Sequence, residues 1–112
     1  GSEKIEFNIK EYIEIIQKLG AGELLLNSID RDGLGYGYDY ETLKEVRSIC
    51  DLPIIAAGGA DNYIELVKGI ESNYLNAVST SHLFNFIGKG ILQTREEMMK
   101  MNANIPVRNI YK

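Results

Sequence analysis

The sequence predicts an α/β fold in which parallel strands alternate with helices. Two observations lead to this prediction: a helical pattern is followed by a strand-helix unit repeated three times, and the strands are short apolar runs of the kind that parallel sheets contain. Three parallel strands make a poor closed domain, because a sheet face and the sheet edges would stay exposed. We therefore interpret residues 1–112 as a single incomplete domain, the last part of a larger barrel or doubly wound sheet.

The first expected element is a helix over residues 9–19. Its apolar side chains recur every three or four positions from Ile9 onward, which is the period of an amphipathic helix. Asn8 is a candidate N-cap with an acid three residues later, as in a capping box. Gly20 or Gly22 supplies the C-terminal stop.

The first strand-helix unit begins with residues 23–29, E-L-L-L-N-S-I, a mostly continuous apolar run. Such runs are typical of strands that are buried on both faces. After a polar loop, Asp39 is the candidate cap of a second helix. We expect this helix to end near Asp51, because Pro53 follows it.

The second unit begins with an apolar strand over residues 53–57. Gly58 and Gly59 end this strand, and either Asp61 or Asn62 caps the third helix.

The third unit is weaker in its pattern. We expect a strand over residues 75–80, a turn or short helix over 81–86, and a last helix over 95–101 capped by Thr94 in a Thr-x-x-Glu box. The three methionines of the last segment are interpreted as helix packing, not as a metal site.

Composition excludes several classes of function. The 112 residues carry 12 basic and 16 acidic side chains, so a general nucleic-acid surface is not expected. One cysteine and one histidine cannot form an internal disulfide or a zinc cluster, which favours a reducing, cytoplasmic setting. No run approaches the roughly twenty apolar residues of a membrane span. We expect no metal and no cofactor.

The candidate site lies in the loops that follow the strands, because ligands of parallel α/β folds bind at the carboxyl ends of strands. The notable residues of these three loops are Asp30, Arg31, Asp32 and Gly33, then Gly58 and Gly59, then Ser81 and His82. Glycines at a strand end let the backbone approach a phosphate group. Together with the barrel-like repeat, the glycine pair favours a phosphate site over a plain turn.

Two interpretations of the charged loop stay open. In one, Arg31 screens Asp30 and Asp32 in a solvated turn. In the other, one carboxylate enters the barrel mouth to hold or deprotonate a polar substrate, and Arg31 sets its orientation and ionisation. Alternate residues of a strand point the same way, so the pattern does not separate the two aspartates.

Three further features have alternative interpretations. Glu23 opens the first strand, at the opposite end from the loops, as a solvated residue or as a charged gate in the barrel base. His82 is a hydrogen-bonded turn residue or a phosphate donor. Tyr36, Tyr38 and Tyr40 form loop packing or a lid.

The order of four segments carries a resemblance to a known family. These segments are G-A-G-E-L-L-L-N-S-I-D-R-D-G, G-Y-D, L-P-I-I-A-A-G-G-A and N-A-V-S-T-S-H-L-F-N-F. Over about residues 8–108 the chain closely resembles the C-terminal part of the cyclase subunit of imidazole glycerol phosphate synthase. The resemblance implies the last three strand-helix units of a (β/α)8 TIM barrel.

The resemblance also implies an activity. The family's barrel is a lyase of histidine biosynthesis that joins ammonia from a glutaminase partner to a phosphoribosyl aminoimidazole ribonucleotide. That substrate carries a phosphate at each end. One phosphate is expected on the loops after the last two strands, at residues that match by position: Gly58, Gly59, Ser81 and His82.

By the same resemblance, Asp32 and Gly33 line the barrel mouth beside that phosphate, and Glu23 belongs to a salt-bridged gate for ammonia. The family's general acid and base are two aspartates on the first and fifth strands, which this sequence does not contain. No catalytic residue is therefore assigned here, Asp32 is at most auxiliary, and the chain alone is expected to be inactive.

Two positions depart from the family. Asn27 stands where threonine is common and His82 where serine is usual, so the phosphate contacts are altered or shift to backbone amides. At these two positions the chain also resembles cyclase-like subunits encoded with surface-polysaccharide genes, whose implied role is to supply ammonia-derived nitrogen to sugars. The sister barrel isomerase and a non-catalytic half-barrel that pairs with itself or with the rest of a barrel are further alternatives. G-Y-D and Glu23 favour the cyclase over the isomerase, which needs no ammonia gate.

Overall fold

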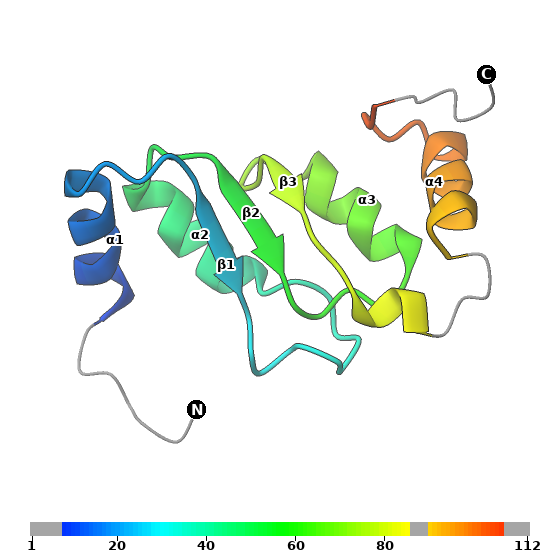
Figure 1. The fold of residues 1–112 in the computed structure, drawn as a ribbon, viewed down its shortest axis with the longest axis horizontal. Helices are drawn as coiled ribbons and strands as arrows, with labels where there is room; N and C mark the ends of the chain where they lie inside the picture. Colours follow the sequence, from blue (N-terminus) through cyan, green and yellow to red (C-terminus); the bar gives the residue numbers. More distant parts are fainter. Residues whose placement is uncertain (1–7, 86–89, 107–112) are drawn as a thin grey trace.

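The elements follow one another in the predicted order of a helix and then alternating strands and helices (Figure 1). The computed structural model describes residues 8–85 and 90–106. Its elements are α1 (Ile9–Lys18), β1 (Leu24–Asn27), α2 (Tyr40–Ile49), β2 (Ile54–Ala57), α3 (Tyr63–Glu71), β3 (Ala77–Val78), the 3-10 helix η1 (His82–Asn85) and α4 (Gly90–Lys100).

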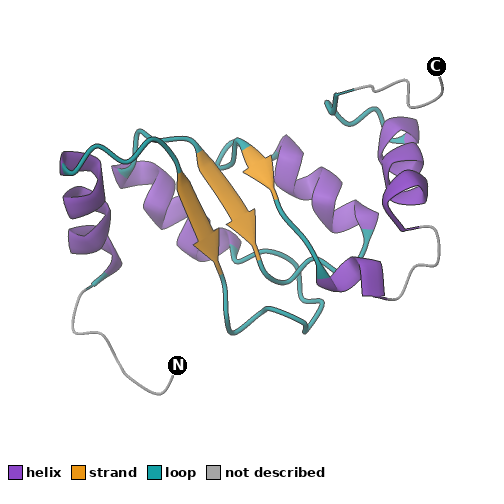
Figure 2. Cartoon of the chain, viewed as in Figure 1, coloured by secondary structure: helices purple, strands orange, loops and turns teal. Residues whose placement is uncertain are grey.

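The three strands form one parallel sheet in the order β1-β2-β3 (Figure 2). Leu24 pairs with Ile54 at the start of β1, and Asn27 pairs with Ala57 at its end. Because the strands are parallel and in sequential order, their carboxyl ends lie at the same edge of the sheet, and the loops that follow them gather there (Figure 1).

The two faces of the sheet differ in burial. Leu24, Ile54 and Ala56 are buried on the face that α2 and α3 cover, whereas Leu25 on the other face is 60% exposed. The expectation that the first strand is buried on both faces is therefore wrong for the described residues. The helices cover one face only, so the side chains of β1 alternate between core and solvent.

The core lies between the sheet and its helices. Its buried apolar side chains come from every helix and from β1 and β2: Ile13, Leu24, Leu43, Val46, Ile54, Ala56, Leu66, Val67 and Met98 are among them. Of the three C-terminal methionines, only Met98 is buried, so the packing role expected for all three holds for one.

Side-chain caps begin the first three helices. The side-chain oxygen of the cap accepts a hydrogen bond from the backbone N–H three residues later at Asn8 (2.8 Å), Asp39 (3.2 Å) and Asn62 (3.1 Å). These bonds satisfy N–H groups that a helix leaves without an internal partner. The predicted caps are confirmed, and the third helix uses Asn62 rather than Asp61.

The last helix begins earlier than the sequence predicts. Thr94 is not its cap, because α4 starts at Gly90 and Thr94 lies inside it with 3% of its surface exposed. The Thr-x-x-Glu pattern misled because the run from Ile91 onward contains no helix breaker, and the Thr94 side chain packs toward α3 and β3 instead of the helix end. Residue 86, included in the predicted turn over 81–86, lies outside the described residues.

The strands are also shorter than expected. The segment 75–80 contributes only Ala77 and Val78 to the ladder, and one further backbone bond, from Ser79 N to Ala56 O (2.7 Å), follows them. In the described part of the chain, no helix has both the length and the apolar character that a membrane span requires.

The Asp39 cap predicts a pH dependence of stability. Burial raises the pKa of Asp39, but hydrogen bonds from the hydroxyl and N–H of Thr42 and the charge of Arg31 outweigh it, so the pKa lies below its usual value of 3.8. Because the pKa is lowered on folding, the ionised Asp39 carboxylate stabilises the folded protein at pH values above 3.8. This stabilisation is lost as the pH falls through the folded-state pKa. At neutral pH we expect Asp39→Ala to reduce the free energy of unfolding by about 1 kcal/mol.

Urea denaturation at neutral pH and near pH 3 measures this difference. The gap between wild type and Asp39→Ala is expected to shrink in acid. Asn62→Ala removes an uncharged cap of the same kind and serves as the control, with a similar loss at both pH values. A gap for Asp39→Ala that does not change with pH contradicts the assignment.

Candidate functional site

A small pocket lies where the three strands end. Its volume is about 150 Å³, and residues of all three strand-end loops line it. Five of the seven residues expected to bind substrate or phosphate are among them: Asn27, Asp32, Gly58, Gly59 and Ser81. We call this the strand-end pocket. Whole small-molecule ligands usually occupy pockets of about 300 Å³ or more, so this volume suits one group of a ligand.

The other expected residues lie elsewhere. Gly33 is in the turn after Asp32, exposed and outside the pocket lining, with a φ of +77°. His82 begins η1 directly after Ser81, but its side chain lies outside the described part of the structure. Glu23 is exposed immediately before β1, at the opposite end of the sheet from the pocket. The roles of all three stay predictions.

The two aspartates of the charged loop face different pockets. Asp32 lines the strand-end pocket, whereas Asp30 lines a separate pocket of about 390 Å³ between β1 and α2. The expectation that they point the same way is wrong, because the chain leaves the extended conformation after Asn27. The N–H groups of Arg31 and Asp32 both donate to the carbonyl of Ser28, at 3.2 and 3.0 Å, and this turn ends the strand alternation.

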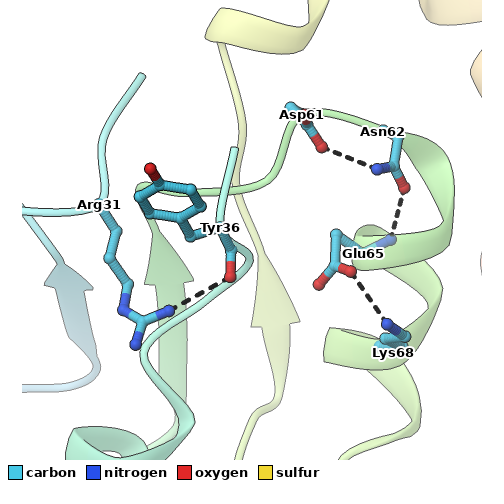
Figure 3. Close-up of polar contacts among 6 residues, drawn as sticks. All are labelled: Arg31, Tyr36, Asp61, Asn62, Glu65 and Lys68. Atoms are coloured by element: carbon cyan, nitrogen blue, oxygen red, sulfur yellow. Dashed lines mark hydrogen bonds and ion pairs between the residues drawn. The ribbon is translucent and has the colours of Figure 1, made fainter. Parts of the chain in front are cut away.

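Arg31 does not hold either aspartate. Its Nη1 donates to the carbonyl oxygen of Tyr36 at 3.2 Å, so the guanidinium lies along its own loop (Figure 3). Among the described residues, no ion pair joins it to Asp30 or Asp32. The prediction that Arg31 orients the carboxylate is therefore wrong for this structure. Its charge contributes instead to the lowered pKa of Asp39.

The glycine pair brings backbone to the pocket. Gly58 and Gly59 have φ values of +83° and +110°, a region that side chains with a Cβ rarely adopt. A Cβ on Gly58 would lie 2.8 Å from Oδ1 of Asn27, and one on Gly59 would collide with the carbonyl oxygen of Gly37. Within residues 8–85 and 90–106, no acceptor takes a hydrogen bond from the N–H groups of Gly58, Gly59 or Ser81.

Hydrogen bonds join the three loops around the pocket. Gly37 N donates to Gly59 O at 2.9 Å, which ties the first loop to the second. The Thr80 hydroxyl donates to Ala60 O at 3.1 Å, which ties the third loop to the second. Sequence reasoning missed Ser79 and Thr80 as lining residues, although their place directly before Ser81 at a strand end could have indicated them.

The tyrosine series divides into separate roles. Tyr38 is buried with 1% of its surface exposed, and its hydroxyl donates to Ser79 O at 2.9 Å, whereas Tyr36 is 74% exposed. The expected role in loop packing therefore holds for Tyr38, whereas the side chain of Tyr36 lies in solvent.

The amino end of α3 is occupied by its own side chains. Asn62 Nδ2 donates to Asp61 Oδ1 at 2.7 Å, and Lys68 Nζ lies 3.0 Å from Glu65 Oε1 (Figure 3). With Asn62 as its cap and Asp61 and Glu65 nearby, this helix end already carries negative charge. These carboxylates make the helix end itself less favourable for an anion.

No group of three or more His, Cys, Asp or Glu side chains that could hold a metal ion occurs in the part of the chain that the structure describes.

Three glycine-to-alanine variants test how strictly position 59 requires glycine. Gly22→Ala is expected to be neutral or slightly stabilising, because its Cβ meets nothing within 4 Å and its φ is ordinary. Gly20→Ala adds the strain of a φ of +84° without a clash, which costs about 1 kcal/mol. Gly59→Ala adds both strain and a backbone collision, and we expect a loss of about 2 kcal/mol or more. Chemical denaturation of the three variants measures this order, and equal stability of Gly59→Ala and Gly22→Ala contradicts it.

The parallel strands in sequential order, alternating with helices, define a class of protein: α/β proteins built from strand-helix units. Residues 1–87 match the family model described as histidine biosynthesis protein, and the chain belongs to this family. The family has the (β/α)8 barrel fold, so the prediction of a partial barrel is confirmed.

Curated relatives agree with this family. The chain is 35% identical over 105 residues to imidazole glycerol phosphate synthase subunit HisF of Chlorobaculum tepidum, covering 94% of this chain and 42% of that protein. It is 38% identical over 97 residues to a putative imidazole glycerol phosphate synthase subunit hisF2 of Parasynechococcus marenigrum, covering 87% and 36%. The chain therefore spans less than half the length of these relatives.

Proposed function

We propose that this chain forms part of a cyclase of the imidazole glycerol phosphate synthase type, a lyase of histidine biosynthesis. We further propose that the strand-end pocket binds one phosphate of a substrate that carries a phosphate at each end. The observation that carries this proposal is the gathering of Asn27, Asp32, Gly58, Gly59 and Ser81 around one small pocket, although they come from three separate loops.

Backbone donors support phosphate binding in this pocket. The N–H groups of Gly58, Gly59 and Ser81 have no acceptor among the described residues, and hydrogen bonds from such groups to an anion are stronger than those to a neutral oxygen. The Ser81 hydroxyl adds a donor that can rotate. Since the lining contains no described basic side chain, the backbone provides most of the binding.

Asp32 has a different role from the phosphate donors. A carboxylate repels a phosphate in the same pocket, so it does not bind that group directly. It is instead suited to accept hydrogen bonds from hydroxyl or amine groups of the substrate next to the phosphate. This makes Asp32 auxiliary, since the proton-transferring aspartates of the family lie on strands outside this sequence.

The second part of the proposal concerns the opposite end of the sheet, where ammonia would enter. Glu23 is exposed immediately before β1, on the end remote from the strand-end pocket. We propose that it contributes to a charged gate through which ammonia from a glutaminase partner enters the barrel. The relatives are named as subunits of a synthase, which supports a partner of this kind.

A second candidate is a homologous subunit that supplies nitrogen to surface-polysaccharide sugars. Asn27 favours it, because this amide replaces a threonine of the cyclases in the pocket lining itself. Its Oδ1 lies against the backbone of Gly58, so this residue changes the shape and the hydrogen-bonding groups offered to the ligand. A sugar phosphate that binds more tightly than the aminoimidazole substrate supports this candidate over the first.

Inorganic phosphate tests the proposed pocket. Titration followed by the backbone amide signals in NMR is expected to shift Gly58, Gly59 and Ser81, with a dissociation constant on the order of millimolar. Asp32→Asn removes a repelling charge and is expected to tighten phosphate binding about two- to fivefold. Asp30→Asn is the matched control, because it removes the same charge from the same turn but faces the other pocket. Absence of shifts at the three amides, or equal effects of both variants, contradicts the assignment.

Turnover tests the missing acid and base. Supplied with ammonia and the phosphoribosyl aminoimidazole ribonucleotide, residues 1–112 alone are expected to form no imidazole glycerol phosphate above the uncatalysed rate. The reason is that general acid-base groups contribute about 10²- to 10⁴-fold each and this sequence contains neither aspartate. Product formation that scales with the concentration of this chain would place a catalytic group within it.

A further inference from the structure

Tyr38 connects two loops that are far apart in the sequence. Its hydroxyl donates to the carbonyl of Ser79 at 2.9 Å, a bond between residues 41 positions apart. Tyr38 itself does not line the strand-end pocket; it lines the separate pocket between β1 and α2. The side chain of Tyr38 therefore reaches the strand-end pocket through Ser79, which lines it.

The segment that Tyr38 holds has little other support from the sheet. β3 has only two residues, and the bond from Ser79 N to Ala56 O is the last that ties it to β2. Ser79, Thr80 and Ser81 then leave the ladder and line the strand-end pocket. The orientation of this segment depends on two bonds from outside the ladder, one at Ser79 O and one from the Thr80 hydroxyl to Ala60 O.

The Tyr38 ring occupies a space that α3 leaves for it. A Cβ on Gly69 would lie 3.1 Å from Cε2 of Tyr38 and 2.5 Å from Cγ1 of Val78. A glycine inside a helix costs about 1 kcal/mol relative to alanine, so its presence in α3 needs a reason. The Val78 side chain and the Tyr38 ring, which both lie against this position, together supply that reason.

We propose that Tyr38 is a positioning residue for the strand-end pocket, because its hydroxyl holds the Ser79 carbonyl and thereby sets the direction of the Ser81 N–H and hydroxyl. This inference rests on the proposed phosphate-binding function. Burial, the neighbouring Tyr40 and Glu65 raise the pKa of Tyr38, so the hydroxyl keeps the proton that it donates.

The neighbouring Tyr40 provides a matched control. Its hydroxyl is buried and has no hydrogen-bond partner among the described residues, and its ring packs edge-on against Tyr38 with 6.5 Å between centroids. Tyr38→Phe and Tyr40→Phe therefore remove the same atom from neighbouring rings, one buried and one partly buried. Only the first removes a hydrogen bond, and removal of an unpaired hydroxyl is nearly neutral or stabilising.

Two readouts on the protein as isolated test the proposal. In the ligand-free state, Tyr38→Phe is expected to shift the amide signals of Ser79, Thr80 and Ser81, while Tyr40→Phe leaves them in place. In a titration with inorganic phosphate, Tyr38→Phe is expected to weaken binding about three- to tenfold, a factor that corresponds to one hydrogen bond to phosphate lost when Ser81 is no longer held in place. Tyr40→Phe is expected to leave phosphate binding unchanged. Both titrations are run where denaturation curves show each variant fully folded.

The outcomes separate this inference from the proposed function. If wild type binds no phosphate, the proposed function fails, and the ligand-free amide shifts still decide whether Tyr38 holds the segment. Unshifted amides in Tyr38→Phe, or phosphate binding that is unchanged while wild type binds, overturn the positioning role. If Tyr38→Phe does not fold, exchange of the hydroxyl protons with solvent in wild type provides a second measurement: the Tyr38 proton, which is bonded to Ser79 O, is expected to exchange more slowly than the Tyr40 proton, and equal exchange overturns the positioning role.

Discussion

The parallel pairing of β1 with β2 and of β2 with β3 is the constraint on which the rest of the structure depends. This pairing places three strand ends at one edge of the sheet, and every residue of the strand-end pocket except Leu25 belongs to a strand end or the loop after it. The ladder is short, with four residues in β1 and two in β3. Beyond the last residue of the ladder, hydrogen bonds between the loops therefore hold the strand ends together. They run from Gly37 to Gly59, from Thr80 to Ala60 and from Tyr38 to Ser79.

The face of the sheet that carries the pocket is also the face that its helices leave uncovered. Leu25 is 60% exposed and lies in the pocket lining, beside Asn27 and Ala57 on the same face. In a closed barrel this face is the interior, so strands from the rest of a barrel would exclude water from the pocket floor. Hydrogen bonds to an anion become stronger as water is excluded. The same backbone donors are therefore expected to bind phosphate more tightly in a complete barrel than on three strands.

The sequence predicted the features that depend on local chemistry. Asn8, Asp39 and Asn62 cap helices because a short polar side chain can bond to an N–H three residues later without help from the fold. It failed where a distant contact decides. Thr94 has the same local pattern as a cap, yet packing against α3 and β3 places it inside α4. Asp30 and Asp32 looked equivalent until the turn at Ser28 separated them, and the partner of Tyr38 is 41 residues away, beyond any periodic pattern.

The glycine-rich loop after β1 combines freedom of the backbone with fixed ends. At its start, the N–H of Asp32 bonds to Ser28 O, and at its end the N–H of Gly37 bonds to Gly59 O. Between these anchors the side chains of Leu34 and Tyr36 are exposed, and Gly33, Gly35 and Gly37 all have positive φ. Glycine lets the chain reverse direction within a few residues, but it does not choose one conformation. Burial of the Tyr38 ring directly after the last of these glycines selects one conformation of the loop end. Its hydroxyl bonds to Ser79 O, which explains why an aromatic residue with a hydroxyl stands at this position.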